Sequence, residues 1–347
     1  MNASPLLPAT MVYSRRVPHI RFCLSFLIIF LAWNFAPAAH AQERTSIAVG
    51  YSAIAVSQVV PWIMREARLF EKYGLNADLI YLGGARVGPA MVSGDLHIAQ
   101  VGGDNVVRSS INGYGMIYIG GTNNRFNFSL MVPPDINRIE DLKGMNFGVT
   151  QVNSSVGFCA RLVLKRFGLN PDKDVKIFQT GGNPESLAAL QAGVIQATLL
   201  SPPLNLKAQS LGFKELIDVG KLAIPYPSTG IGTTRSFIKN NRDAALRYLM
   251  GYIEGLNLFF TNKKIAGEVI KKYTHITDPK TLDVTYDYGL KIVERVPRPT
   301  LEGLQTVLDV VSAVDPRAKN YKPADFVDLS LLEELEKGGF IKKFSSL

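Results

Sequence analysis

The sequence predicts an α/β protein of two lobes, in which mostly parallel sheets are flanked by helices. Three observations lead to this prediction. Short β-prone apolar runs alternate with longer segments of helical periodicity, a break at Pro133-Pro134-Asp135 separates two such sets, and a long, almost wholly helical segment follows. The chain has 347 residues, of which 47% are hydrophobic, so each lobe can bury a core of its own.

The first 41 residues have the composition of an export signal. Arg15, Arg16 and Arg21 precede the apolar run Leu24–Trp33, and Ala39-His40-Ala41 has the small-x-small pattern that a signal peptidase accepts. Ten helical residues reach only about 15 Å, which disfavours the alternative of a permanent membrane anchor. We therefore expect cleavage after Ala41.

The chain is basic, with 38 Lys and Arg against 29 Asp and Glu and a formal net charge of +9. Three of these arginines lie in the export signal, so the mature chain keeps 35 basic residues and a net charge of +6. The remaining basic residues are interleaved with acidic ones, which is typical of solvated helix faces. The composition therefore indicates no nucleic-acid partner and no membrane surface.

The first set of elements follows the export signal. The predicted strands are Ser46–Tyr51, Ala77–Leu82, His97–Val101 and Met116–Ile119, and the predicted helices are Ser57–Tyr73, Val87–Ser93 and Asp104–Asn112. The first helix has the clearest end signals, with Ser57 as candidate N-cap, Pro61 in its first turn and Gly74 just beyond its end.

The second set and the helical segment complete the chain. The predicted strands are Phe147–Thr150, Val175–Phe178 and Ala197–Leu200, and the predicted helices are Ser154–Phe167, Pro184–Ala192, Leu204–Leu211, Asp243–Phe260, Lys263–Tyr273, Pro279–Val293, Leu301–Val314 and Ala324–Lys337. Because the last five helices form a segment too long to remain unpacked, we expect it to return to the first lobe. The first lobe then comprises residues 42–127 and 228–347, and the second lobe residues 128–227.

Catalytic and metal-binding motifs are absent from the mature sequence. It has two histidines, His97 and His275, and it contains none of the patterns HExxH, CxxC, GxSxG or a Walker loop. Cys23 lies in the export signal, so Cys159 has no disulfide partner, and we expect it to be a buried structural thiol. We therefore expect no enzyme activity, no cofactor and no metal.

The turns after the predicted strands are the places to look for a ligand. In open parallel sheets, ligands lie beyond the carboxyl ends of the strands, where helix N-termini offer unpaired N–H groups. These turns consist mainly of small, hydroxyl and amide residues, as in Gly83-Gly84, Gly102-Gly103 and Gly181-Gly182. The same residues also form ordinary turns and caps, but their repetition at one edge favours a cleft for a small polar solute.

Four segments resemble a known family. FEKYGL (Phe70–Leu75), AMVSGDLHIAQVG (Ala90–Gly102), IEDLKGMNFGV (Ile139–Val149) and ESLAALQAGVIQATLLSPP (Glu185–Pro203) resemble the periplasmic solute-binding proteins of ABC importers for nitrate, sulfonates and taurine, and the related thiamine-pyrimidine precursor binders. The resemblance implies a type II periplasmic binding-protein fold, with crossovers near Asn124–Val132 and Pro225–Gly232. It also implies a monomer in the periplasm whose partners are a small-molecule solute, an inner-membrane permease and its ATPase subunit.

The turns and the resemblance together define the predicted ligand-binding residues. They are Ser52, Gly84, Arg86, Gly103, Asp104 and Asn123 in the first lobe, and Asn153, Ser154, Gly182, Asn183 and Ser201 in the second. Arg86 stands where the family more often has a small hydroxyl residue, so it either meets an anionic group or is an exposed arginine at a helix start. Asp104 needs a ligand amine, an arginine such as Arg86 or Arg108, or a capping role. A zwitterionic or nitrogen-bearing solute reconciles Arg86 with Asp104.

Two other functions are compatible with the same fold. The eukaryotic pyrimidine synthase related to this family has a cysteine-rich iron motif, whereas the equivalent stretch here has Cys159 alone. A ligand-sensing accessory of a membrane receptor is the other alternative, and the genes beside this one would distinguish it from a transport protein.

Overall fold

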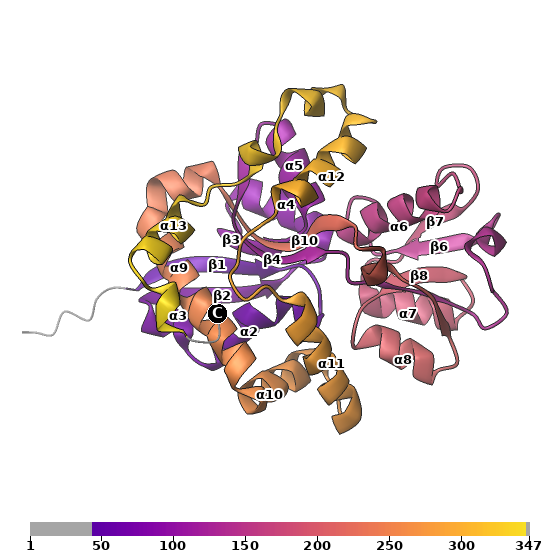
Figure 1. The fold of residues 1–347 in the computed structure, drawn as a ribbon, viewed down its shortest axis with the longest axis horizontal. Coiled ribbons are helices and arrows are strands. Elements are labelled where there is room, and N and C mark those ends of the chain that lie inside the picture. Colours follow the sequence, from indigo (N-terminus) through magenta and orange to yellow (C-terminus); the bar gives the residue numbers. More distant parts are fainter. Residues whose placement is uncertain (1–43, 345–347) are drawn as a thin grey trace, which may run out of the picture. The chain divides into compact units, whose positions relative to one another are not determined.

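The computed structural model describes residues 44–344, which form two five-stranded sheets with helices packed against them (Figure 1). The two sheets confirm the predicted two-lobed α/β fold. The predicted export signal and its cleavage site lie outside the described residues. Within residues 44–344, no helix combines the length and the apolar character that crossing a membrane requires.

The sheet of the first lobe has the strand order β2-β1-β3-β10-β4. Its strands are β1 (Thr45–Tyr51), β2 (Leu75–Tyr81), β3 (Ile98–Val101), β4 (Met116–Arg125) and β10 (Pro225–Thr234). β1 pairs in parallel with β2 and β3, whereas β10 runs antiparallel to β3 and β4. The sheet is mixed because β10 returns to it from the second lobe.

The sheet of the second lobe has the strand order β7-β6-β8-β5-β9. Its strands are β5 (Ser129–Val132), β6 (Asn146–Val149), β7 (Lys176–Gln179), β8 (Ala197–Leu200) and β9 (Lys214–Asp218). β6 is parallel to β7 and β8, and β5 is antiparallel to β8 and β9. Each sheet therefore has a parallel half, formed by βα units, and an antiparallel half at the connection between lobes.

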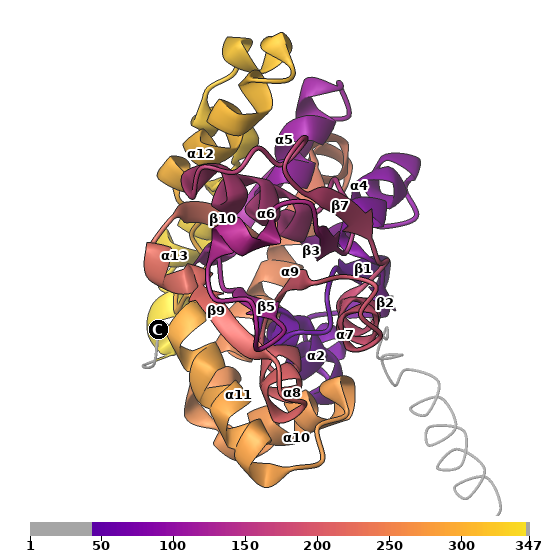
Figure 2. The same cartoon turned by 90° about the vertical axis from the view of Figure 1, so that its right-hand side faces the viewer.

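Helices cover both faces of the first sheet (Figures 1 and 2). α4 (Gly84–Ser93), α5 (Gly103–Ile111) and α12 (Leu301–Ser312) lie on one face, and α2 (Val59–Glu66), α9 (Arg235–Thr261) and α10 (Lys263–Thr274) lie on the other. α3 (Leu69–Lys72) and α13 (Ser330–Lys337) pack against α9, and α11 (Pro279–Ile292) packs against α10. Thus α9, α10, α11 and α13 share one core with α2 and β1, whereas α12 packs into the core formed with α4 and α5.

The second lobe carries α6 (Ser155–Arg166), α7 (Asn183–Gln191) and α8 (Leu204–Ser210). Cys159 in α6 is a free thiol with no exposed surface, as the sequence predicts. Short 3-10 helices occupy Val56–Gln58 (η1), Ile139–Leu142 (η2), Val219–Leu222 (η3), Pro316–Asn320 (η4), Pro323–Phe326 (η5) and Ile341–Lys343 (η6).

The prediction of one continuous helix over Ser57–Tyr73 is wrong, because the structure has two separate helices there, α2 and α3. Arg68 has a left-handed backbone conformation with φ of 55°, and this residue separates α2 from α3. Ser57 is buried within η1 and does not cap α2, whose N-cap is Gln58. Near the other end of the chain, α13 begins at Ser330 rather than Ala324 because η5 and a short link precede it.

The chain crosses between the sheets twice. Residues 126–128 connect β4 to β5, inside the expected range Asn124–Val132, and residues 219–224 connect β9 to β10. The second crossover therefore precedes the expected range Pro225–Gly232, which forms part of β10. The pairing of β10 with β4 is irregular between Pro225 and Thr229, where two prolines remove ladder donors, and becomes regular near its end.

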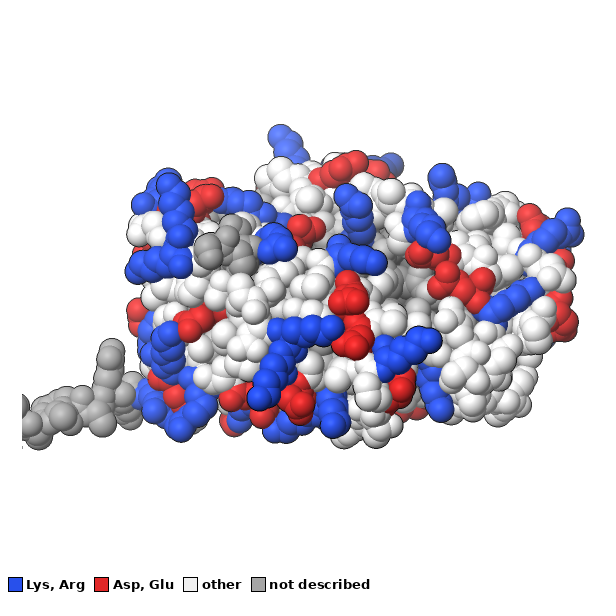
Figure 3. All heavy atoms as spheres, turned by 60° about the horizontal axis from the view of Figure 1, so that its bottom comes forward, with Lys and Arg blue, Asp and Glu red and all other residues white. Residues whose placement is uncertain are grey.

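Charged side chains of both signs alternate over the face that Figure 3 shows. Lys and Arg do not gather there into one large patch. This distribution agrees with the interleaved charges of the sequence.

Candidate ligand-binding cleft

A cleft of about 60 Å³ lies between the two lobes, and both lobes, the first crossover and β10 contribute to its walls. The first lobe contributes Ser52, Ala53, Ala55, Ser57, Gln58, Tyr81, Gly83, Gly102 and Asn105; the second contributes Thr150, Ser154, Ser155, Val156, Gly181, Gly182, Asn183 and Ser201; the first crossover contributes Asn127 and Phe128; and β10 contributes Ser228 and Thr229. None of these lining residues carries a formal charge. The cleft therefore has to recognise a ligand through neutral hydrogen-bonding groups.

Four helices begin at this cleft. The N-cap residues of α4, α5, α6 and α7 are Gly83, Gly102, Ser154 and Gly182, and all four line it. Ser154 caps α6 with its own side chain, since its Oγ accepts from the N–H of Gly157 at 3.2 Å. The three glycines cannot do this, so the first N–H groups of α4, α5 and α7 have no side-chain cap.

Side chains in the cleft are partly held by one another. Gln58 accepts from the backbone N–H of Ser52 at 3.2 Å and donates to its Oγ at 3.3 Å. Asn183 is 8% exposed, and its Oδ1 has no hydrogen-bond partner among the described residues. A buried amide oxygen without a donor is unfavourable, so Asn183 is a group that a solute can satisfy.

Asp104 connects the two lobes beside the cleft. Its side chain is 2% exposed, and Oδ1 accepts from the Tyr226 hydroxyl at 2.6 Å and from Ser155 Oγ at 3.2 Å. Ser155 opens α6 of the second lobe, and Tyr226 lies in β10. Burial raises the pKa of Asp104, and the hydrogen bond from Tyr226 and the charge of Arg108 oppose this shift. Asp104 therefore has partners from both lobes without any ligand.

Five predicted ligand-binding residues line the cleft, namely Ser52, Ser154, Gly182, Asn183 and Ser201. Gly84 and Gly103 are the first residues of α4 and α5, directly after the lining residues Gly83 and Gly102.

The other four predicted residues lie outside the lining. Asp104 and Asn153 line an adjacent groove together with Ser154. Asn123 lines a pocket at the crossovers. Arg86 is exposed at the rim, beside Gly83 and Tyr81.

The cleft also contains residues that the sequence does not predict. Asn127 belongs to the first crossover, and Ser228 and Thr229 belong to β10, whose sequence pattern resembles a loop. Tyr81 and Asn105 do carry a signal, because they adjoin the glycine pairs of the predicted turns. Both lie within two residues of a glycine pair.

Comparisons with known proteins agree with this architecture. A model of the NMT1-like family matches residues 40–271, a range that includes all four segments on which the sequence resemblance rests. No curated protein matches the chain.

Three solved structures illustrate the shared fold. The alkanesulfonate-binding protein SsuA from Xanthomonas axonopodis pv. citri, bound to MOPS, matches with a TM-score of 0.70 and 17% identity, covering 82% of this chain and 99% of its own. The periplasmic aliphatic sulphonate-binding protein SsuA from Escherichia coli has a TM-score of 0.65 and 16% identity, with 82% and 92% covered. The periplasmic nitrate-binding protein NrtA from Synechocystis PCC 6803 has a TM-score of 0.68 and 13% identity, with 85% and 89% covered. These matches confirm the predicted periplasmic binding-protein fold.

Proposed function

Because the chain belongs to the NMT1-like family and has the fold of periplasmic binding proteins, we propose that it is the extracytoplasmic solute-binding component of an ABC importer. It captures a small polar solute between its lobes and delivers it to an inner-membrane permease that works with an ATPase subunit. It acts in the periplasm as a monomer, without a cofactor and without catalysing a reaction.

The observation that carries this proposal is the shared cleft. Donors and acceptors from both lobes face one volume of about 60 Å³, so a solute bound there contacts both lobes at once. Closure then strengthens binding, and opening removes one lobe's contacts and permits release. A transport protein needs both states.

The chemistry of the walls favours a solute with an oxyanion head, such as a small sulfonate or carboxylate. Three helix N-termini without side-chain caps provide N–H groups, and that of α4, which has no acidic residue in its first turn, also provides a partial positive charge. Asp104 is already hydrogen-bonded by Tyr226 and Ser155, so no ligand amine is needed to satisfy it. Asp104 therefore gives no reason for a zwitterionic solute, whereas the free Asn183 Oδ1 favours a solute that carries a donor beside its oxyanion head.

Isothermal titration of the mature protein against methanesulfonate, taurine, a simple alkylamine and an aminopyrimidine tests this proposal. We expect binding of the oxyanion-bearing solutes. Taurine, whose amine can donate to Asn183 Oδ1, should bind about fivefold more weakly to Asn183→Ala, because a single hydrogen bond contributes about 1 kcal/mol. Ser210→Ala, an exposed change at the end of α8, is the matched control and should leave affinity unchanged. Failure of all four solutes to bind, together with no co-purified solute in native mass spectrometry of periplasmic protein, would contradict the proposal.

A further inference from the structure

A second cavity, of about 390 Å³, lies at the crossovers and shares no lining residue with the cleft. We call it the hinge pocket. Its walls come from the end of β4, from the second crossover and from α11 with the residues just after it. It therefore touches both segments that must bend when the lobes open or close.

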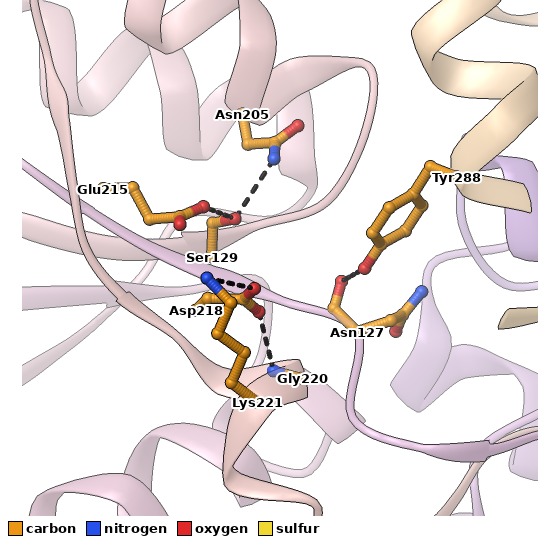
Figure 4. Close-up of polar contacts among 8 residues, drawn as sticks. All are labelled: Asn127, Ser129, Asn205, Glu215, Asp218, Gly220, Lys221 and Tyr288. Carbon is orange, nitrogen blue, oxygen red and sulfur yellow. Dashed lines mark hydrogen bonds and ion pairs between the residues drawn. The ribbon is translucent and has the colours of Figure 1, made fainter. Parts of the chain in front are cut away.

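One contact at the hinge pocket connects α11 to the first crossover, and others hold the start of the second crossover (Figure 4). The Tyr288 hydroxyl of α11 donates to the carbonyl of Asn127 in the first crossover at 3.0 Å. Asp218, at the start of the second crossover, accepts from the Gly220 N–H at 3.0 Å and lies 3.6 Å from Lys221 Nζ. Because these contacts involve residues of both crossovers, the shape of the hinge pocket should change when the lobes open or close.

The charged groups of the hinge pocket are not balanced. Its two carboxylates are engaged, since Asp218 has Gly220 and Lys221, and Glu294 accepts from Asn124 Nδ2 at 3.2 Å. Arg125 and Lys291 also line the pocket, and no carboxylate of residues 44–344 lies within ion-pair distance of either. The three cations and two carboxylates of the lining give the pocket a net charge of +1, and Arg125 and Lys291 are its cations without an ion-pair partner.

Asn123 provides an independent indication of a ligand. Its side chain is 2% exposed and lines the hinge pocket, and Oδ1 accepts from the backbone N–H of Arg125 at 3.2 Å. This bond fixes the orientation of the amide, because a flipped amide would place a donor against a donor. The opposite group, Nδ2, has no partner among the described residues. Two exposed cations without an ion-pair partner thus line the pocket, and one buried donor in its wall has no acceptor.

We propose that the hinge pocket binds a small multi-oxygen anion, of the phosphate, sulfate or small-carboxylate class. The anion lies between Arg125 and Lys291 and satisfies the amide of Asn123. Because it also contacts the second crossover, its binding is coupled to the angle between the lobes. This site is distinct from the cleft and does not depend on the identity of the transported solute.

The test is titration of the mature protein with inorganic phosphate, sulfate and malonate by calorimetry, at constant ionic strength maintained with chloride. We expect saturable binding of one anion at the hinge pocket and at least tenfold weaker binding in the Arg125→Gln/Lys291→Gln double variant. The matched control is Lys239→Gln, an exposed lysine on α9, which should bind within twofold of wild type. Asn123→Asp should weaken binding even more, because it replaces a donor by a negative charge, and circular dichroism verifies that the variant is folded.

Two variants separate this site from the cleft. Asn183→Ala should leave binding at the hinge pocket unchanged, and the double variant should retain solute binding in the cleft. Absence of saturable binding for all three anions, or equal binding by wild type and the double variant, overturns the proposal. Loss of anion binding in Asn183→Ala overturns it as well, because that result places the anion in the cleft.

Discussion

The Tyr226 hydroxyl donates a 2.6 Å hydrogen bond to Asp104 Oδ1 beside the cleft. Tyr226 also stacks on Phe126 and Phe158, with ring centroids 4.0 Å and 5.0 Å apart. Phe158 belongs to α6 of the second lobe, whereas Asp104 belongs to α5 of the first. One tyrosine of β10 therefore contacts both lobes, through its hydroxyl and through its ring.

Removing this hydroxyl should destabilise the protein without disturbing the ring stack. Tyr226→Phe leaves a buried carboxylate with one donor fewer, which costs about 1–3 kcal/mol in free energy of unfolding. Tyr114→Phe, an exposed tyrosine, should change it by less than about 0.5 kcal/mol. Urea unfolding followed by circular dichroism measures both, and equal stability of the two variants would show that the Tyr226 bond contributes nothing.

Asp104 should make a distinctive contribution to the pH dependence of stability. Its pKa is raised by burial, so the folded state binds this proton more tightly than the unfolded state does. The contribution of Asp104 to stability is therefore greatest below the ordinary aspartate pKa and is lost as pH rises through the raised value. Asp104→Asn cannot ionise and does not show this loss. The difference in free energy of unfolding between Asp104→Asn and wild type should therefore shift in favour of the variant as pH rises above 4.

The partly exposed Asp141 provides the control of opposite sign. Hydrogen bonds from the backbone of Arg138 and Asn137 lower the pKa of Asp141, so its contribution is lost as pH falls. Asp141→Asn should therefore lose stability relative to wild type as pH rises through that lowered pKa. The same slope in both variants would contradict the assignment for Asp104.

Gly102 should be essential for closure of the lobes. A Cβ at this position would overlap Ser155 Oγ of the second lobe and lie 2.9 Å from Asp104 Oδ1. Gly102→Ala should therefore hold the lobes apart and weaken solute binding at least tenfold, and small-angle scattering should show a larger radius of gyration with solute present.

A second change should rescue that variant. Ser155→Gly removes the side chain that the new methyl group meets, so Gly102→Ala/Ser155→Gly should recover most of the affinity. Gly267→Ala in α10, where the nearest atom is 3.9 Å away, is the matched control and should bind as wild type does. No rescue in the double variant would mean that the clash with Ser155 is not the cause.

Cys159, the one thiol among residues 44–344, should be unreactive in the native state. Cys159 is fully buried, and burial raises the pKa of its thiol well above the usual value, so little thiolate forms at neutral pH. Its reaction with a thiol-specific disulfide reagent should proceed only at the rate of unfolding. Ser210→Cys, an exposed site on α8, should react within the mixing time, and equally fast labelling of Cys159 would contradict its burial.

The sequence predicts the parallel half of each sheet better than the antiparallel half. Short apolar runs followed by helices form β1, β3, β6 and β8, so the hydrophobic pattern of the sequence is sufficient to predict these strands. β10 contains Pro225, Pro227, Gly230 and Gly232, a composition typical of loops, and only its position between β3 and β4 makes it a strand. Its place is determined by tertiary pairing, which local sequence does not encode.

The candidate site follows the same division. Turn residues such as Ser154, Gly182 and Asn183 are found from sequence because the carboxyl ends of parallel strands meet at one edge. The charged residues are harder to place, since the direction of a side chain depends on its packing. Asp104 turns toward Tyr226 and Ser155, and Arg86 stays at the rim, so neither charge enters the lining.

The position of β10 also determines the order in which the polypeptide completes its structure during biosynthesis. Within residues 44–344, β4 forms a ladder with β10 alone, apart from an isolated bridge between Tyr118 and Val327, so the first sheet remains unfinished until residue 234 has emerged. All five strands of the second lobe, from Ser129 to Asp218, emerge before that point. The sheet of the second lobe can therefore be completed first, although this lobe begins later in the sequence. The sheet of the first lobe can be completed only after β10 has been synthesised.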